Sequence, residues 1–248
     1  MRRLPMMTGA SRHGSRAQQA AGLGEVMSSV ARDLQKEHGD VEATLRGILK
    51  AAAQTIPGAE ECGVTYVVGR DQLESRAGTS ALPKEVDALQ CRLQEGPCLD
   101  AVWKNKVVRV DDVAGEERWP RFTRDASELG VVSMLCFQLF AEGNSLGALS
   151  LYGRVPNAFD DETEGIGLVF AGHAAVALAG AQHEENLRTG MAHRDVIGQA
   201  KGILMERHKL TADLAFAALV RASSVTNRKL LDIAEELVST GHLPPTPT

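Results

Sequence analysis

The chain of 248 residues is 44% hydrophobic and 24% charged, a composition typical of a soluble globular protein with one or two domains. Its four cysteines (Cys62, Cys91, Cys98 and Cys136) include no CxxC pair, and its histidines lack metal-ligand spacing. The sequence therefore indicates no zinc site, disulfide framework or metal cofactor. It contains no run of about 18 apolar residues, which argues against a membrane span.

Charge is distributed unevenly along the chain, whose net charge is −5. Between Arg188 and Lys229 there are eight Lys or Arg and three Asp or Glu, which gives this stretch a charge of +5. Such asymmetry is found in segments that bind a polyanion, and equally in solvated helical surfaces. Charge alone therefore leaves polyanion binding open.

Residues 1–20 are rich in Arg, Gly, Ser and Gln, and no apolar segment follows the arginines. This pattern does not match a secretory signal and predicts a disordered leader. We therefore expect a cytoplasmic protein with reduced thiols.

The first half of the chain predicts helices followed by short strands. Apolar residues at helical spacing predict helices over Leu23–Glu37 and Val41–Ile56. A strand is predicted over Cys62–Val68, with a turn at Gly69–Asp71 and a returning strand over Gln72–Ala77. The next expected elements are helices over Pro83–Leu93 and Cys98–Lys104, a strand over Val107–Val110, and a loop with a short helix over Asp111–Gly130.

The strongest strand signals are Ser133–Phe140 (SMLCFQLF) and Leu146–Tyr152 (LGALSLY). The connection Ala141–Asn144 predicts a hairpin in which Gly143 and Asn144 take positive φ. Because both runs are strongly hydrophobic, we expect them at the centre of the sheet. The order of elements indicates an α+β domain with a central antiparallel sheet flanked by helices, rather than an alternating parallel-sheet enzyme.

A long helix is predicted to close this domain and to continue past it, because no proline occurs between Asp160 and His208. Leu187, Met191, Ile197, Ala200 and Leu204 continue its apolar stripe beyond the domain edge. A helix with such a stripe needs a partner, so we expect a coiled-coil-like homodimer through the helix around residues 160–205.

The C-terminal part predicts a basic three-helix bundle. Its first helix runs to His208, and Thr211 caps a second helix with Leu214, Ala215, Ala218, Leu219 and Ala222 inward. Thr226 or Asn227 is predicted to cap a third helix, which ends at Gly241. The inward residues of this third helix are predicted to be Leu230, Ile233, Ala234, Leu237 and Val238.

The run from Arg194 to Arg207 (RDVIGQAKGILMER) resembles the first helix of an ANTAR domain. Thr211–Phe216 (TADLAF) and Asn227–Leu230 (NRKL) match its second and third helices at the right offsets. The resemblance covers Asp195 to Val238. It implies a transcription antiterminator that binds paired RNA stem-loops in a nascent leader and acts as a dimer under a sensor domain.

The upstream part resembles a GAF domain. Ser133 to Tyr152, with the following Asn157–Asp160 and helix, looks like the second half of that fold, and Glu95–Cys98 (EGPC) resembles a stretch of bacterial proteins that join GAF to ANTAR. We therefore expect a leader at 1–20, a GAF-like sensor domain at 21–182, an ANTAR domain at 183–243 and a tail at 244–248. A small-molecule ligand of the sensor domain remains open, and no cofactor is predicted.

Recognition of an RNA hairpin loop needs cations and small polar groups beside a surface that allows close approach. Lys201 next to Gly202 meets this need, although close helix packing is an alternative explanation for Ala200 and Gly202. Arg228 and Lys229 lie at a positive helix end, which suggests an external anion; a solvated helix start is the alternative. The expected RNA-contacting residues are Arg194, Gln199, Lys201, Gly202, Arg207, His208, Lys209, Ser223, Thr226, Asn227, Arg228 and Lys229.

The candidate sensor residues are Cys91, Cys98, Trp103, Trp119 and Cys136. A thiol that responds to oxidation needs exposure and a low pKa, and a helix start at Cys98 would lower the pKa of its thiol. The alternative is that Cys98, Cys136 and the two tryptophans are plain core.

Two other classes of function were weighed against RNA binding. A DNA-binding helix-turn-helix needs a recognition helix for the major groove, whereas Asp232, Glu235 and Glu236 make the third helix acidic after Lys229. An enzyme is disfavoured because the sequence contains no Walker loop, nucleophile elbow, HExxH or dinucleotide fingerprint.

Overall fold

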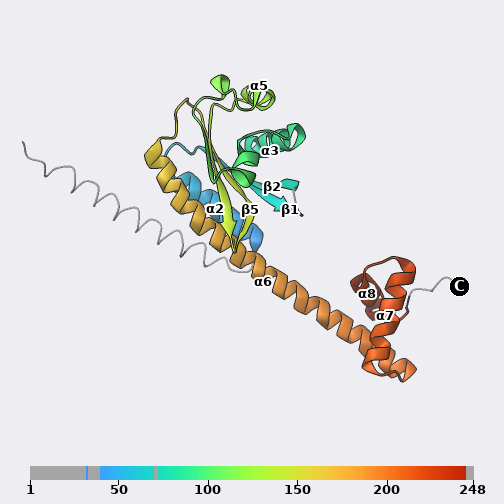
Figure 1. Ribbon diagram of the computed structural model, residues 1–248. Coiled ribbons are helices and arrows are strands. Elements are labelled where there is room, and N and C mark those ends of the chain that lie inside the picture. Colours follow the sequence, from blue (N-terminus) through green and yellow to red (C-terminus); the bar gives the residue numbers. More distant parts are fainter. Residues whose placement is uncertain (1–31, 33–39, 70–71, 244–248) are drawn as a thin grey trace, which may run out of the picture. The chain divides into compact units, whose positions relative to one another are not determined.

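The computed structural model describes residues 40–69 and 72–243 together with Arg32. The predicted leader, the helix over Leu23–Glu37 apart from Arg32, residues 70–71 of the predicted turn and the tail lie outside these residues. The chain divides into two compact units, Met1–His183 and Glu184–Thr248 (Figure 1). Helix α6 (Asp161–His208) contributes to both units.

The first unit is built on a five-stranded antiparallel sheet with the strand order β2-β1-β5-β4-β3 (Figure 1). The strands are β1 (Glu61–Val68), β2 (Gln72–Gly78), β3 (Val107–Val110), β4 (Ser133–Ala141) and β5 (Asn144–Gly153). The two most hydrophobic runs of the sequence form β4 and β5, with β5 in the middle of the sheet. The predicted α+β fold with a central antiparallel sheet is confirmed.

The β4–β5 hairpin differs from its prediction in one detail. Glu142 and Gly143 take the positive φ values, 55° and 82°, whereas Asn144 pairs with Ala141 and begins β5. A two-residue loop with two positive φ values matches the twist of the strands better than a longer connection. The prediction that Asn144 takes positive φ is therefore wrong.

Helices cover both faces of the sheet, and successive residues of β4 alternate between two cores. Leu135 and Phe137 face the core formed with α2 (Val41–Thr55) and α6, whereas Met134 and Cys136 face the other core. That second core is covered by α3 (Ala81–Leu93), α4 (Pro97–Trp103), the short 3-10 helix η1 (Val113–Gly115) and α5 (Pro120–Glu128). Burial on both faces explains why β4 reads as a continuous apolar run.

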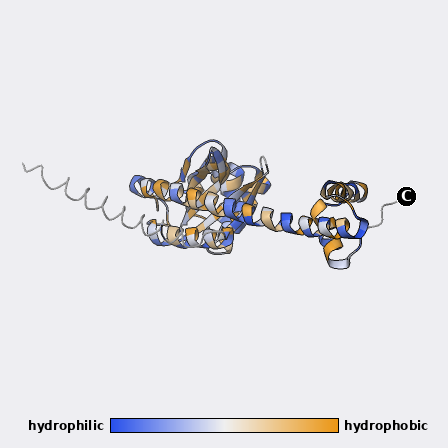
Figure 2. Cartoon of the chain, turned by 90° about the horizontal axis from the view of Figure 1, so that it is seen from below, coloured by the Kyte–Doolittle hydropathy of each residue, from blue (hydrophilic) through white to orange (hydrophobic). Residues whose placement is uncertain are grey.

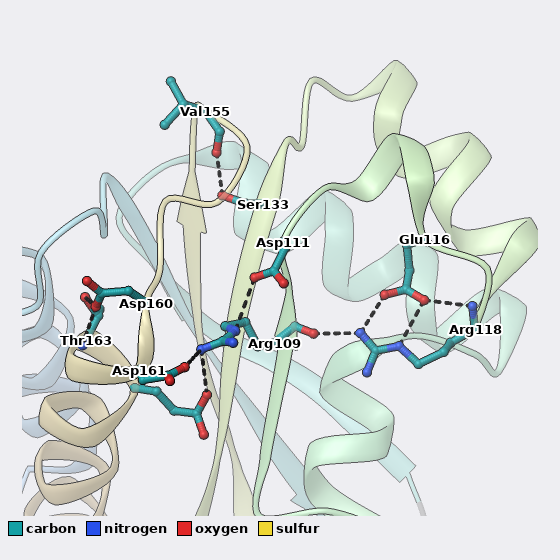
Figure 3. Close-up of polar contacts among 10 residues, drawn as sticks. Arg109, Asp111, Glu116, Arg118, Ser133, Val155, Asp160, Asp161 and Thr163 are labelled. Atoms are coloured by element: carbon teal, nitrogen blue, oxygen red, sulfur yellow. Dashed lines mark hydrogen bonds and ion pairs between the residues drawn. The ribbon is translucent and has the colours of Figure 1, made fainter.

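Charged residues fix the beginning of α6 to the edge strand β3. Arg109 donates to Asp161 at 2.8 Å and to Glu164 at 3.3 Å, and its Nε lies 3.2 Å from Asp111 (Figure 3). Asp160 caps the helix, because its Oδ1 accepts from the backbone N–H and the hydroxyl of Thr163, each at 2.8 Å. These contacts hold the first turn of α6 in place.

Helix α6 is continuous from Asp161 to His208, through both Gly180 and Gly190. Of the described helices it is the one long and apolar enough to cross a membrane by length and composition. The apolar character of α6 comes from the segment Gly165–His183, which contains no Asp, Glu, Lys or Arg, although it includes His and Gln. Its Phe170, Ala174 and Leu178 are fully buried against the sheet, as in the core helix of a soluble domain.

The second unit contains the end of α6, α7 (Ala212–Thr226) and α8 (Leu230–Thr240). Ala200 and Leu204 of α6 pack against Ala215, Leu219 and Ala222 of α7 and Ile233, Ala234 and Leu237 of α8. Thr211 accepts from the backbone N–H of Leu214 at 3.4 Å, and Gly241 ends α8 with φ 76°, as predicted.

Two predictions for this unit are wrong. Leu214 is 56% exposed, because the inward face of α7 is narrower than the predicted stripe and consists of Ala215, Leu219 and Ala222. The N-cap of α8 is Lys229, without a side-chain hydrogen bond. Asn227 instead ends α7 in the left-handed conformation, with φ 51°, which asparagine tolerates well.

Candidate RNA interface and sensor domain

The predicted RNA-contacting residues all lie in the second unit, and none of them is buried. Lys201, Ser223 and Thr226 are half-buried, and the other nine are exposed. Their charges, however, are not equally available, and their positions divide into separate groups along α6 and α7.

Two of the predicted cations are paired with carboxylates. Arg228 Nη1 lies 2.6 Å from Glu236 Oε2, and Lys209 Nζ lies 2.9 Å from Glu206 Oε1. The position of Arg228 at a positive helix end therefore does not by itself indicate an external anion, since α8 supplies an anion to this residue. Each pair is exposed enough for solvent to weaken it.

The other predicted cations have no carboxylate partner within the described part of the chain. These are Arg194, Lys201 and Lys229, together with Arg207, whose guanidinium donates to the carbonyl of Gly241 and keeps its net charge. Arg221 of α7 is a further exposed cation of this kind. The cationic charge that the unit can offer to a ligand therefore comes chiefly from these residues.

Lys201 and Gly202 occupy the middle of the helical hairpin formed by α6 and α7. Lys201 Nζ lies 5.8 Å from the centroid of the Phe216 ring, and Phe216 is 41% exposed. Apart from the adjacent residues and backbone of its own helix, no atom of the described chain lies within 4 Å of the position that a Cβ on Gly202 would take. Close helix packing thus explains Ala200, which is fully buried, and does not explain Gly202.

The predicted polar clusters lie at opposite ends of this hairpin. Arg207, His208 and Lys209 are at the turn before α7, whereas Ser223 to Lys229 are at its far end. The 15 residues of α7 put roughly 22 Å between these ends at 1.5 Å per residue. The two clusters are therefore separate surfaces, with Lys201 and Phe216 between them.

The hydroxyls of the α7–α8 junction donate to the backbone. Ser223 Oγ donates to the carbonyl of Arg228 at 2.6 Å, and Thr226 Oγ1 donates to that of Ala222 at 2.7 Å. Because both hydroxyl protons are used in this way, the two residues stabilise the junction and are not free to donate to an external anion. Their oxygen lone pairs can still accept from a donor.

In the first unit, Cys98 and Cys136 are buried and their sulfurs are 3.8 Å apart. Cys98 Sγ also lies 2.8 Å from Gln90 Nε2 and 2.9 Å from Ser150 Oγ. The contact with Cys136, together with burial, raises the pKa of the Cys98 thiol well above its ordinary value. Of the two readings of Cys98, the buried structure therefore favours plain core, because the contact with Cys136 and burial outweigh any lowering of the thiol pKa by the helix end.

The other three candidate sensor residues differ in their burial. Trp119 belongs to the same buried core, beneath the guanidinium of Arg118 at 4.4 Å. Trp103 is 45% exposed at the end of α4. Cys91 is half-buried and, with Gln72, Leu73, Glu74, Gln94 and Leu99, lines a pocket of about 330 Å³. The five residues do not form one pocket.

The EGPC stretch, residues 95–98, connects α3, α4 and α5 through hydrogen bonds and close packing. Glu95 Oε1 accepts from the backbone N–H groups of Arg121 and Phe122 at 2.8 and 2.9 Å, which caps α5. Gly96 has φ 141° and lies so close to the Gln90 side chain that a Cβ would overlap it. The backbone N–H of Cys98 donates to Gln90 Oε1 at 2.8 Å.

Asp87 is a buried acid that the sequence analysis did not single out. It is 2% exposed on the inner face of α3, and its Oδ1 lies 3.9 Å from Cys98 Sγ. Burial raises the pKa of its carboxyl to about 6, and the neighbouring hydroxyls of Ser75 and Thr65 offset only part of the effect. Its spacing to the buried Pro83, Val86 and Gln90 is the sequence signal for its position.

Family models match nearly the whole described chain: a GAF domain over residues 38–179 and an ANTAR domain over residues 185–238. The chain belongs to the GAF family and carries a C-terminal ANTAR domain. The resemblances inferred from the sequence are confirmed. GAF domains are sensory and ANTAR domains are RNA-binding antitermination modules, so this GAF–ANTAR chain joins a sensor to an RNA-binding module.

Solved structures resemble the GAF unit in fold. The GAF domain of a phosphoenolpyruvate-protein phosphotransferase from Acinetobacter is 14% identical, with a TM-score of 0.53 over 66% of this chain and 97% of that one. A free methionine-R-sulfoxide reductase from Neisseria meningitidis is 18% identical, with a TM-score of 0.52 over 74% and 99%. At these identities the likeness shows the fold alone. No curated protein matches the sequence of the chain.

Proposed function

We propose that the ANTAR domain binds two adjacent stem-loops in nascent leader RNA and so prevents a terminator hairpin from forming. The observation that carries the proposal is the set of unpaired cations on α6, above all Lys201. Its ammonium has no carboxylate partner in the described chain, and it lies beside Gly202, which is exposed and which no other segment of the described chain covers. A cation next to open backbone suits contact with a phosphate and sugar edge.

RNA is favoured over duplex DNA by the charge of α8. Asp232, Glu235 and Glu236 follow Lys229 along this short helix. Inserted into a major groove, these carboxylates would face the phosphates on either side. The cations of α6 and α7 are instead spread along a hairpin, which suits an RNA loop with unstacked bases.

The two stem-loops correspond, in this proposal, to two copies of the chain joined through α6. Val169, Val176, Leu187 and Met191 are apolar, exposed and spaced by seven, eleven and four residues along the helix. The spacings of seven and eleven place Val169, Val176 and Leu187 at positions d, d and a of one heptad repeat, and Met191 lies at the flanking position e. Figure 2 shows hydrophobic residues interspersed with hydrophilic ones along α6. Each copy would then present one RNA-binding surface.

The GAF domain, proposed to span residues 21–182, would control the ANTAR domain, proposed to span residues 183–243. Helix α6 belongs to both units and is the direct covalent route between them. A small-molecule signal in the GAF domain is compatible with the pocket beside Cys91. The proposal places the chain in the cytoplasm, where the nascent transcripts of bacteria are made.

The test is a gel-shift comparison with the full chain. The probe is a pool of RNAs that carry two adjacent stem-loops with randomised loop sequences, set against duplex DNA of the same sequences. We expect preferential retention of RNA and enrichment of particular loop sequences after selection. Equal or tighter binding of duplex DNA would contradict the proposal and support a DNA-binding regulator.

A further inference from the structure

Phe216 stands out on the surface of the ANTAR domain. The inward residues of α7 are Ala215, Leu219 and Ala222, whereas Phe216 is 41% exposed next to them. An aromatic ring in contact with water loses the free energy that burial would provide. The chain places this ring 5.8 Å from the ammonium of Lys201, on the neighbouring helix.

The surroundings of this pair are apolar and open. Met205 lies one turn after Lys201 on α6, and Val220 lies one turn after Phe216 on α7; both are exposed. The backbone at Gly202 is also open, because a Cβ at this residue would meet no other segment of the described chain within 4 Å. An exposed ring, a cation at its side and bare backbone therefore occupy one small area, midway between the two polar clusters.

We propose that Phe216 is a stacking platform for an unpaired base of an RNA loop, with Lys201 binding the phosphate of the same nucleotide. The inference rests on the proposed function and names the residue that receives the base. Aromatic side chains stack on splayed-out loop bases, which a duplex does not offer. The ammonium of Lys201 is attracted to the ring and is thereby held next to it.

This arrangement predicts that removal of the Phe216 ring and removal of the Lys201 ammonium reduce RNA affinity in different ways. A stacking ring contributes through the base, so its removal weakens binding to loops that carry the base and spares loops that lack it. The ammonium contributes through the phosphate, so its removal weakens binding to every loop and lowers the dependence on salt.

The test uses the full chain and an RNA selected from the randomised two-stem-loop pool. We expect Phe216→Leu to bind this RNA about 10- to 100-fold more weakly, and Phe216→Tyr to bind within a few-fold of the unchanged chain. With an abasic site in place of the stacked base, Phe216→Leu and the unchanged chain should bind equally. Leu214→Ala, which removes an exposed apolar side chain from the same helix, is the matched control and should leave affinity unchanged.

Two further measurements distinguish a loss of base stacking from a loss of folded structure and from a loss of charge. Circular-dichroism melts of Phe216→Leu should match those of the unchanged chain. Lys201→Met should reduce the slope of log affinity against log salt by about 1, while Phe216→Leu leaves the slope unchanged.

The inference is overturned if Phe216→Leu binds as well as the unchanged chain, or if its loss persists in full on every abasic RNA. In either case the proposed function stands as long as the unchanged chain retains the RNA. Failure of the unchanged chain to bind any RNA in the pool overturns both.

Discussion

Arg228 Nη1 and Glu236 Oε2 lie 2.6 Å apart, which joins a residue two positions before α8 to the second turn of that helix. This ion pair neutralises a cation that the sequence places in an apparently exposed basic cluster. It also divides the basic residues of the ANTAR domain into those whose charge is balanced and those, such as Lys201, whose charge is available to a ligand.

The first prediction concerns this division. Lys201→Gln should weaken RNA binding more than Arg228→Gln, because only Lys201 presents an unbalanced charge. Glu236→Gln should strengthen RNA binding several-fold, because it releases the charge of Arg228. Fluorescence anisotropy with one selected RNA at several salt concentrations measures all three. A larger loss for Arg228→Gln than for Lys201→Gln would contradict this assignment.

The second prediction concerns two glycines of α6. A Cβ on Gly167 would overlap the ring of Phe137 in β4, whereas a Cβ on Gly165 has no atom within 4 Å. Gly167→Ala should destabilise the GAF domain by about 1–3 kcal/mol through overpacking. Gly165→Ala should stabilise it by up to about 1 kcal/mol, because alanine favours the helix. Denaturant unfolding of the two variants checks the opposite signs; equal effects would mean that α6 does not pack on β4 as described.

The third prediction concerns the pH dependence of stability. Since burial raises the pKa of folded Asp87 to about 6 from an ordinary 3.8, the folded state holds this proton more tightly than the unfolded chain. Its contribution to stability is present at acidic pH and is lost as the pH rises through about 6. Asp87→Asn should therefore be more stable than the unchanged chain at neutral pH, by up to about 3 kcal/mol.

Thermal melts between pH 4.5 and 8 measure this effect. The gain in melting temperature from Asp87→Asn should grow from pH 4.5 to about pH 6.5 and then level off. Glu85→Gln, at an exposed position of the same helix, is the control and should show no such trend. A gain independent of pH would show that Asp87 does not titrate in this range.

Much of the fold could be predicted from the sequence because its signals are local. The apolar residues of β4 are continuous because both faces of this strand are buried. The helix caps at Thr211 and Gly241 depend on adjacent residues. The sequence left the state of Cys98 open because this state depends on Cys136, which is distant in sequence and adjacent in the core. The pairing of Arg228 was missed for a similar reason, since Glu236 lies two turns further along.

The candidate RNA site shows the same division. Lys201 and Gly202 were proposed as RNA contacts from residue type and position in the sequence. Phe216 was not, because its role depends on a contact between two helices and on an exposure that the apolar pattern of α7 hides.

The fourth prediction concerns the dimer proposed through α6. Val176→Glu with Leu187→Glu should shift the chain from dimer to monomer, because charges in an apolar seam cannot be desolvated cheaply. Phe140→Glu replaces a side chain of similar exposure at the end of β4 and should leave the dimer intact. Sedimentation velocity distinguishes the species. A monomer for the unchanged chain, or a dimer that survives the double substitution, would contradict the proposed seam.

The most direct test of the proposed function is sequencing of the RNA that crosslinks to the chain in cells. The account predicts reads concentrated in transcript leaders that contain two adjacent stem-loops ahead of a terminator, with the signal lost in Lys201→Gln. Reads scattered over transcripts without such leaders, and unchanged by Lys201→Gln, would contradict it.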